Sequence, residues 1–137
     1  MIKNITAGID FGNQSSILSI PSEHGIDIVL NESSNRKTPS MVGYQEGRRL
    51  AGEFAQQQQM MNINNTITQL KRLVGLPFIS EEREIMSNSV AYKITQLEDG
   101  SSGIELENGQ ILRIEQIIGY YLSSLIEIIR KKNPDIE

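Results

Sequence analysis

The chain has 137 residues, a formal net charge of −4 and a sequence pI near 5.1, so one domain or a piece of one is expected. This mildly acidic balance argues against a general nucleic-acid binder, and the absence of cysteine excludes disulfides and thiolate metal sites. No stretch approaches the roughly 18 apolar residues of a membrane span, and no signal peptide is visible. We therefore expect no nucleic-acid or membrane partner, and a location in the cytoplasm, with the nucleus as a second option.

The first 31 residues read as a three-stranded meander. Short apolar runs are separated by turn residues, with Pro21 and Gly25 marking the second turn. Strands one and three are apolar at most positions, which predicts burial on both faces. The expected strands are Ile5–Ile9, ending near Phe11, then Ser15–Ile20, then Ile26–Leu30.

The first turn of this meander carries residues with binding chemistry. Asp10 is able to hold a cation directly or through water, and Gly12 lets the backbone approach a ligand without a Cβ in the way. The amides of Asn13, Gln14 and Ser15 then point together at a phosphate. From these residues alone, a plain hairpin turn is an equally good interpretation.

Residues 31–114 read as short elements joined by polar turns. Asp99-Gly100 and Asn108-Gly109 are strong hairpin signals, and Thr66–Gln69 has the capping-box spacing of a helix start. The expected elements are a polar loop at 31–39, strands at 41–44 and around 50–51 joined at Glu46-Gly47, a helix at 53–61, a helix at 66–74 stopped by Gly75 and Pro77, a short helix opened by Ser80, and strands at 92–97, 104–106 and 111–114.

The helix expected over residues 66–74 contains a lysine in a notable position. At about 100° per residue, Ile67, Leu70, Leu73 and Val74 form one face, and Lys71 falls at its edge. A lysine at the border of a buried stripe either snorkels to water or points into a cleft. On the residues alone, snorkelling is the commoner outcome.

Four ordered segments resemble one known family. They are Gly8-Ile9-Asp10-Phe11-Gly12-Asn13, then Asn31 to Ser40, then Asn65-Thr66, then Leu70-Lys71-Arg72-Leu73-Val74-Gly75. In this order they resemble the start of the nucleotide-binding domain of the 70-kDa heat-shock (DnaK-like) chaperone superfamily. Gly12-Asn13-Gln14-Ser15 in place of Gly-Thr-Thr-Tyr, the segment Ser89 to Leu97, and the Asn-Glu-x-Ser-Asn-Arg form of the second motif are similar to its 110-kDa heat-shock branch.

The resemblance implies an α/β fold of the actin-like ATPase (ribonuclease H-like) type, with two lobes around a nucleotide cleft. This chain would supply part of lobe one: a mixed sheet and a smaller α+β outer subdomain. Residues 1–38 would form inner-subdomain strands with the phosphate turn, 39–114 the outer subdomain, and 115–137 a helix returning to the inner subdomain. The family continues with further strands and a second lobe, so the chain is expected to be truncated.

The resemblance also implies cofactors and residue roles. ATP or ADP with Mg²⁺ would bind at the turn, through Gly12, Asn13, Gln14 and Ser15 together with Lys71. Lys71 would position the attacking water, and Asp10 would lie near the cation, holding it through water. The change from Thr-Thr-Tyr to Asn-Gln-Ser keeps backbone amides and loses hydroxyls, which affects hydrolysis more than binding. We expect weak ATPase activity from the full-length protein and none from this piece alone.

Several functions compete. The leading one is the ATP-binding lobe of a chaperone that acts as a nucleotide exchange factor for 70-kDa heat-shock chaperones and holds unfolded clients. The alternatives are an ATP-hydrolysing 70-kDa chaperone, a small-molecule kinase of the same superfold, and a purely structural interaction module. ATP turnover and nucleotide release from a partner chaperone separate the first two, and absence of nucleotide binding favours the last.

The final helix, expected over Glu115–Lys132, carries a wide apolar face. Its apolar side chains recur at helical spacing, and without the later strands of the sheet we expect them to lack cover. We therefore expect the chain either to self-associate or to hide this helix by an altered packing, in both cases to cover Ile118, Tyr121, Leu122, Leu125 and Ile129.

Overall fold

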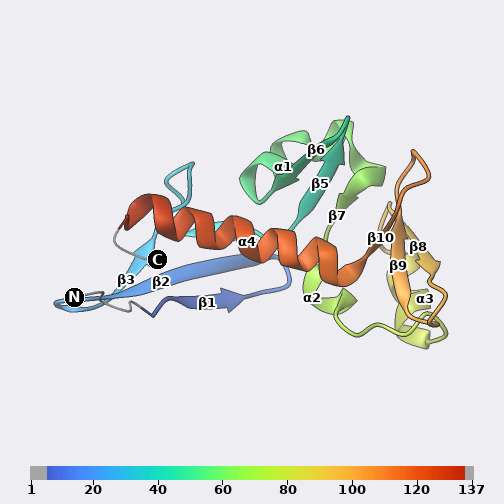
Figure 1. Cartoon of the computed structure of the whole chain (residues 1–137), viewed down its shortest axis with the longest axis horizontal. Helices are drawn as coiled ribbons and strands as arrows, with labels where there is room; N and C mark the ends of the chain where they lie inside the picture. The colour runs from blue at the N-terminus through green and yellow to red at the C-terminus, as the bar shows by residue number, and fades with distance from the viewer. Residues whose placement is uncertain (1–5, 135–137) are drawn as a thin grey trace.

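The computed structural model describes residues 6–134. The first element of the fold is a sheet built around one long central strand. Strand β2 (Ser15–Ser22) pairs antiparallel with β1 (Gly8–Phe11) along one edge. Along the other edge of β2, β4 (Lys37–Pro39) pairs with the first half of the strand and β3 (Gly25–Val29) pairs with the second half. Figure 1 shows β1, β2 and β3 in blue below the long terminal helix. The predicted hairpins are confirmed, but β4 lies in the stretch expected to be a polar loop.

Two details of this sheet differ from expectation. Strand β2 continues through Pro21, and the turn falls at Glu23 and His24; Ile5 lies outside the described residues. Burial of the first and third strands on both faces is wrong, since Ile26 is 76% exposed and only Val29 of β3 is buried. An antiparallel sheet packed on one side leaves its other face in water, and among residues 6–134 that second face has no cover.

A second, smaller sheet follows. Strands β5 (Val42–Gln45) and β6 (Arg48–Ala51) form the predicted hairpin, with both Glu46 and Gly47 at positive φ. The helix α1 (Glu53–Gln58) continues into the 3-10 turns η1 (Gln59–Met61) and η2 (Ile63–Asn65). Strand β7 (Thr66–Ile67) then adds to the free edge of β5, giving the order β6-β5-β7.

The predicted helix start at Thr66 is wrong. Thr66 and Ile67 pair with Gly43 and Val42 of β5, and the Thr66 hydroxyl donates to the Asn62 carbonyl at 2.7 Å. The helix α2 covers only Leu70–Leu73, after a left-handed Gln69. A strand edge at β5 offered backbone hydrogen bonds to these residues, and this tertiary pairing overrides the local capping pattern. The predicted apolar face is therefore split between two elements, and Val74 is 59% exposed.

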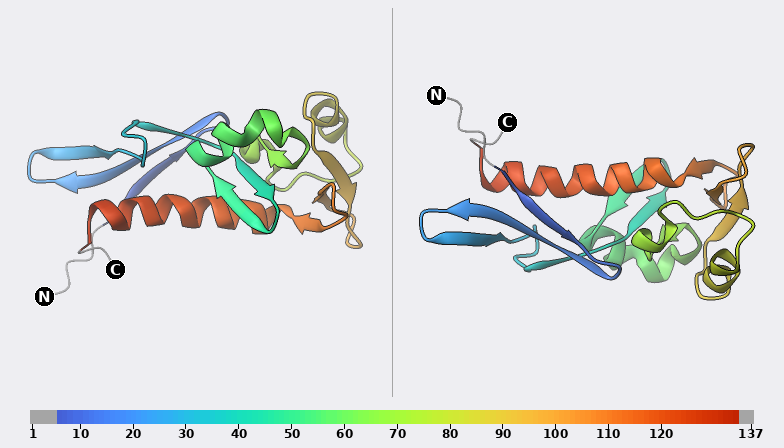
Figure 2. Two further views of the ribbon diagram at one scale, coloured as in Figure 1. Left: turned by 90° about the horizontal axis from the view of Figure 1, so that it is seen from above. Right: turned by 90° about the horizontal axis from the view of Figure 1, so that it is seen from below.

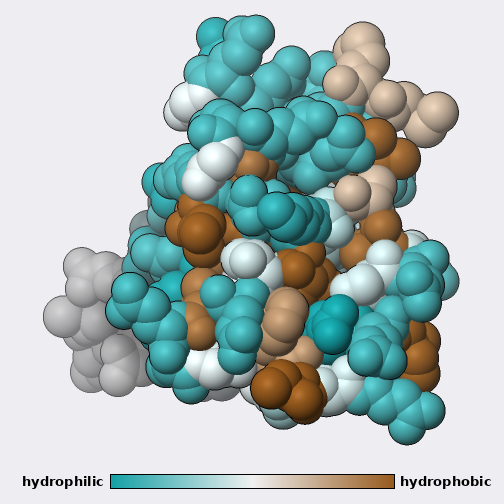
Figure 3. All heavy atoms as spheres, turned by 90° about the vertical axis from the view of Figure 1, so that its right-hand side faces the viewer, coloured by the Kyte–Doolittle hydropathy of each residue, from teal (hydrophilic) through white to brown (hydrophobic). Residues whose placement is uncertain are grey.

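The third sheet is a β-meander at one end of the molecule. Helix α3 (Glu81–Ser87) begins as predicted, with the Ser80 hydroxyl accepting from the Arg83 amide at 3.2 Å. Strands β8 (Lys93–Gln96), β9 (Ser102–Glu105) and β10 (Ile111–Arg113) follow, with β9 in the centre. The surface at this end is largely hydrophilic, with hydrophobic side chains in separate small patches (Figure 3).

The helix α4 (Ile114–Lys132) runs from the third sheet past the second to the first, and contacts elements from all three sheets (Figures 1 and 2). One hydrophobic core extends along it, from Leu18 and Val29 of the first sheet to Ile104 and Leu112 of the third. No helix among residues 6–134 is long and apolar enough to cross a membrane. The buried residues of α4 are Ile114, Ile117, Tyr121, Leu125, Ile128 and Ile129.

The expectation that the apolar face of α4 lacks cover is wrong. Tyr121 and Leu125 have no exposed surface and Ile129 is 3% exposed within the single chain. Ile118 and Leu122 are half-buried against the same core. Elements of all three sheets receive this face, so the argument from an uncovered helix fails, and self-association itself stays a prediction. The predicted division at residues 38 and 114 stays a prediction.

Two buried tyrosines make stability sensitive to alkaline pH. Burial raises the pKa of Tyr92 and of Tyr121 above the ordinary value of 10.0. The unfolded chain therefore releases these protons first, so the stabilisation is complete below pH 10 and is lost as the pH rises toward the folded-state values. We expect the free energy of unfolding in urea to fall between neutral pH and about pH 11. Tyr92→Phe removes one of these titrating groups, so its free energy of unfolding should fall less steeply between neutral pH and about pH 11 than that of the wild type. An equally steep fall would contradict this prediction.

Candidate functional site

The β1–β2 hairpin brings the predicted turn residues together. Phe11, the last residue of β1, pairs with Ser16, and residues 12–14 connect β1 to the start of β2 at Ser15. Asp10 is next to the end of β1 and its side chain is exposed. The five turn residues thus form one local group, and their roles stay a prediction: Asp10, Gly12, Asn13, Gln14 and Ser15.

Glycine is required at position 12 by crowding. A Cβ built on Gly12 would lie 2.3 Å from the Ser15 carbonyl oxygen, far inside van der Waals contact. The φ of Gly12 is not in the left-handed region, so the constraint is space and not backbone torsion. The chain therefore doubles back so closely that only a residue without a side chain fits.

A cluster of buried hydroxyls ties this turn to the rest of the fold. The Ser40 hydroxyl donates to the Gly12 carbonyl at 2.8 Å, and the Ser40 amide donates to the Gln14 carbonyl at 2.9 Å. Ser16 Oγ lies 3.0 Å from Ser40 Oγ, and the Tyr121 hydroxyl donates to Ser16 Oγ at 2.9 Å. Ser16, Ser40 and Tyr121 are all buried. Two carbonyls of the turn are thus held by an interior polar group.

Sequence reasoning missed this hydroxyl cluster. Ser40 appeared only as the end of a motif, and Tyr121 was counted as part of an apolar helix face. The available signal was that a tyrosine on a buried face needs a partner for its hydroxyl. Burial raises the pKa of Tyr121, while its hydrogen bonds with Ser16 and Ser40 lower it, so the group remains protonated at neutral pH.

The segment after β3 is fixed next to the turn by one asparagine. The Asn31 side-chain oxygen accepts from the Ser33 and Asn35 amides, each at 3.0 Å. Its amide nitrogen donates to Glu53 Oε1, also at 3.0 Å, and to the Lys37 carbonyl at 3.1 Å. These contacts explain how a polar sequence forms an ordered loop leading into β4.

An open hollow of about 620 Å³ lies between this loop and the turn. Gln14 and Ser15 line it on one side, and Arg36 and Lys37 on the other. It therefore brings two cationic side chains near the predicted phosphate turn, together with the carboxylate of Glu53, which also lines the hollow.

Lys71 lies on α2, which Figures 1 and 2 show close to the β1–β2 turn. Its side chain is exposed, whereas neighbouring Leu70 and Leu73 are fully buried. Arg72 instead bonds to Gln69 Oε1 at 2.7 Å and to Glu82. The buried leucines hold the short helix, and Lys71 is left available to a ligand or to water.

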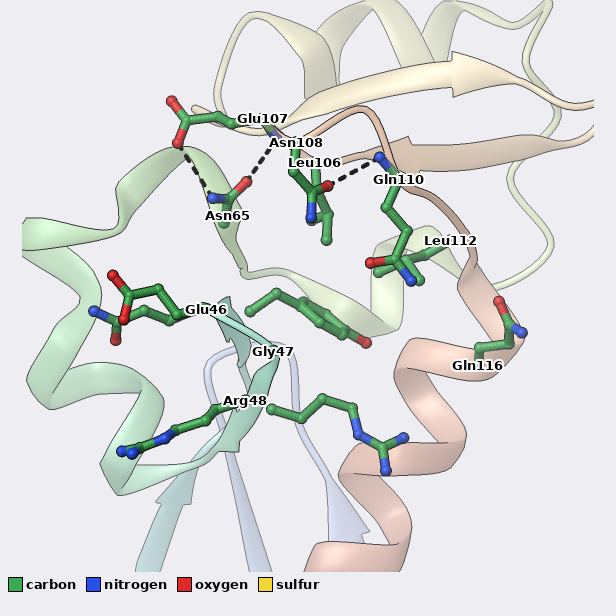
Figure 4. Close-up of a pocket in the computed structure, with 13 residues that line it drawn as sticks. Glu46, Gly47, Arg48, Asn65, Leu106, Glu107, Asn108, Gln110, Leu112 and Gln116 are labelled. Carbon is green, nitrogen blue, oxygen red and sulfur yellow. Dashed lines mark hydrogen bonds between the residues drawn. The ribbon is translucent and has the colours of Figure 1, made fainter.

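A larger hollow, about 800 Å³, lies elsewhere. It lies between the β5–β6 turn, the β9–β10 turn and the start of α4 (Figure 4). Asn65, at the end of η2, is bonded to the β9–β10 turn: it donates to Glu107 Oε2 at 3.2 Å and accepts from the Glu107 amide at 2.9 Å. None of the predicted site residues lines it, so it is not the predicted nucleotide site.

The cation prediction rests on one carboxylate. Among residues 6–134, no group of three or more His, Cys, Asp or Glu side chains is placed to hold a metal. A Mg²⁺ ion that keeps several waters and binds substrate phosphates requires only one or two carboxylates. The exposed Asp10 beside the turn fits that role. The side-chain oxygen of Asn13 is buried with no hydrogen-bond partner and is free to accept from a bound water.

The fold and the hairpin define a class of protein. A glycine-only turn between antiparallel strands, an acidic residue before it, and helices packed beside it are the parts of one lobe of an actin-like ATPase, as the fold prediction stated. The model of the Hsp70 protein family matches residues 6–133. The chain therefore belongs to the Hsp70 family, and the predicted resemblance and fold class are confirmed.

Individual relatives agree with this assignment. The chain is similar to a heat shock protein homolog of Saccharomyces cerevisiae, at 42% identity over 74% of the chain. It is similar to a heat shock protein homolog of Eremothecium gossypii, at 37% identity over 93% of the chain. Heat shock 70 kDa protein 14 of Arabidopsis thaliana shows 35% identity over 90% of the chain. The matched regions span 15%, 19% and 15% of these relatives, so the chain covers less than a fifth of their length.

Crowding at Gly12 gives a stability test. We expect Gly12→Ala to lower the free energy of unfolding by about 1–3 kcal/mol, because its Cβ would meet a backbone carbonyl that cannot move away alone. Gly119→Ala is the matched control, since nothing lies within 4 Å of its Cβ position on α4. That change should raise stability by about 0.5–1 kcal/mol. Urea unfolding measures both, and equal effects would contradict the crowding argument.

Proposed function

We propose that this chain is the ATP-binding lobe of a chaperone that promotes nucleotide exchange on 70-kDa heat-shock chaperones and holds unfolded clients. The observation that carries the proposal is the glycine-only turn, whose carbonyls are tied inward, in a chain of the Hsp70 family. Nothing in this geometry favours a small-molecule kinase or a purely structural module over that function.

The turn residues are suited to phosphates of ATP or ADP. The backbone of Gly12 permits close approach, and the amides of Asn13, Gln14 and Ser15 would donate to phosphate oxygens. Asp10 would hold Mg²⁺ through water, and the ion would supply charge neutralisation for the phosphates. Arg36 and Lys37 add positive charge on the far side of the neighbouring hollow.

Exchange is favoured over hydrolysis by the side chains of the turn. Asn13 and Gln14 supply amide groups where hydroxyls are expected in the hydrolysing chaperones. Binding through backbone amides does not depend on these side chains, whereas positioning of water does. The runner-up, an ATP-hydrolysing 70-kDa chaperone, is favoured by Lys71, which stays exposed on a helix close to the turn. In either case we propose a cytoplasmic protein, with the nucleus as a second option.

The test uses the full-length protein. Calorimetry with ATP and Mg²⁺ should show binding, and addition of the protein should accelerate release of a labelled nucleotide from a 70-kDa chaperone. Rapid turnover of ATP without any acceleration of release would favour the runner-up. Absence of nucleotide binding would exclude both functions.

A lysine variant tests the assignment of Lys71. In the full-length protein, Lys71→Ala should reduce ATP turnover by about a hundredfold, because a cation near the γ-phosphate acts mainly on the transition state. Its affinity for ATP should change by less than about threefold. Lys132→Ala, at the exposed end of α4, is the control and should leave both values unchanged. Turnover equal to wild type would show that Lys71 only snorkels.

The isolated 137-residue chain provides a further test. We expect it to bind ATP with a dissociation constant well above the micromolar range and to hydrolyse none, because one open hollow leaves most of a nucleotide in water. Calorimetry on this chain alone measures it. Micromolar or tighter affinity would mean that the described residues hold a complete site.

A further inference from the structure

A buried row of hydroxyl groups connects the middle of α4 to the β1–β2 turn. The row consists of Tyr121, Ser16 and Ser40, and it ends on the Gly12 carbonyl. The ring of Tyr121 also lies against Phe11, with centroids 5.9 Å apart. Two residues near opposite ends of the chain, Tyr121 and Gly12, are therefore joined by three short contacts of 2.9, 3.0 and 2.8 Å.

Proton counting fixes the direction of this row. Each hydroxyl has one proton to donate. The Ser40 proton goes to the Gly12 carbonyl, so the 3.0 Å contact between the two serines uses the proton of Ser16. Ser16 then has to accept from Tyr121, in agreement with the 2.9 Å bond. The longer contacts of Tyr121, to Ser40 Oγ and the Thr38 carbonyl at 3.4 Å, compete for the same proton.

The row has a consequence for the amides of the turn. The peptide bonds of the described residues are trans, so the N–H of each residue points away from the carbonyl that precedes it. Ser40 holds the Gly12 and Gln14 carbonyls on its own side. The amides of Asn13 and Ser15 are therefore turned away from Ser40.

We propose that Tyr121 is a positioning residue for phosphate, one that keeps the Asn13 and Ser15 amides oriented by way of Ser16 and Ser40. This inference rests on the proposed nucleotide binding at the same turn. It assigns to α4 a role in affinity besides its role in the core. The part of the ligand concerned is the phosphate group of a nucleotide. Binding of the base and the ribose does not depend on Tyr121.

The variant Tyr121→Phe tests this in the full-length protein. It keeps the ring against Phe11 and removes only the hydroxyl. We expect affinity for ATP and for ADP to fall about threefold to tenfold, the effect of one hydrogen bond, while affinity for adenosine stays unchanged. Tyr120→Phe is the matched control, because its hydroxyl donates to the Arg49 carbonyl, away from the turn. It should change none of the three affinities.

A purely structural role gives a different pattern. Equal loss of affinity for adenosine and for ADP, or no loss for either, would overturn the inference. Ser40→Ala removes the last donor of the row and should reproduce the phosphate-specific loss, so it decides the matter if Tyr121→Phe does not fold. The variant that combines Tyr121→Phe with Ser40→Ala should bind ATP and ADP no more weakly than Ser40→Ala alone, because both changes act through the same hydrogen-bonded hydroxyls.

Hydrogen exchange gives a second readout without ligand. The Ser40 amide, which donates to the Gln14 carbonyl at 2.9 Å, should exchange faster in Tyr121→Phe than in wild type, while amides of β9 should not change. Uniformly faster exchange would indicate general destabilisation and would overturn the inference. If the wild-type protein binds neither ATP nor ADP, the proposed function itself is overturned. If the wild type binds both and Tyr121→Phe binds them equally well, only the role of Tyr121 is overturned.

Discussion

Burial of one face of α4 is the interaction on which the rest of the structure depends. The helix supplies six buried side chains, and its core continues from Leu18 in the first sheet to Ile104 in the third. None of the three sheets is large enough to stand alone, because small antiparallel sheets need a packed apolar face for stability. The helix provides that face to all of them, and so fixes the positions of loops that are far apart in sequence.

Within this face, Tyr121 differs from its neighbours by carrying a polar group into the core. A buried hydroxyl without a partner would cost about 1–3 kcal/mol, so its bond to Ser16 is required for the packing to be favourable. The same requirement joins the helix to the turn through Ser40. Stability of the core and geometry of the turn are therefore coupled at one residue, which links the fold to the proposed binding of phosphate.

The polar segment between β3 and β5 has a related role. Asn31 is buried and uses both ends of its amide to organise the loop around itself, with Glu53 of α1 as a partner. The loop then delivers β4 and Ser40 to the start of β2. Two cationic residues of this segment, Arg36 and Lys37, face the hollow beside the turn. A stretch made mostly of polar residues thus becomes a structural wall of the candidate site.

The sequence by itself determined the hairpins, the long helix, the family and the identity of the turn residues, because these depend on local patterns: Gly-containing turns, apolar periodicity and the order of short motifs. Only the tertiary structure decided which neighbour each segment takes. Thr66 and Ile67 joined β5 although their spacing is typical of a helix cap. The buried face of α4 is covered by elements of all three sheets, and Tyr121 contacts Ser16, which lies 105 residues away in the sequence. Such contacts depend on the free strand edges and buried donors left when the whole chain packs, and no local pattern records them.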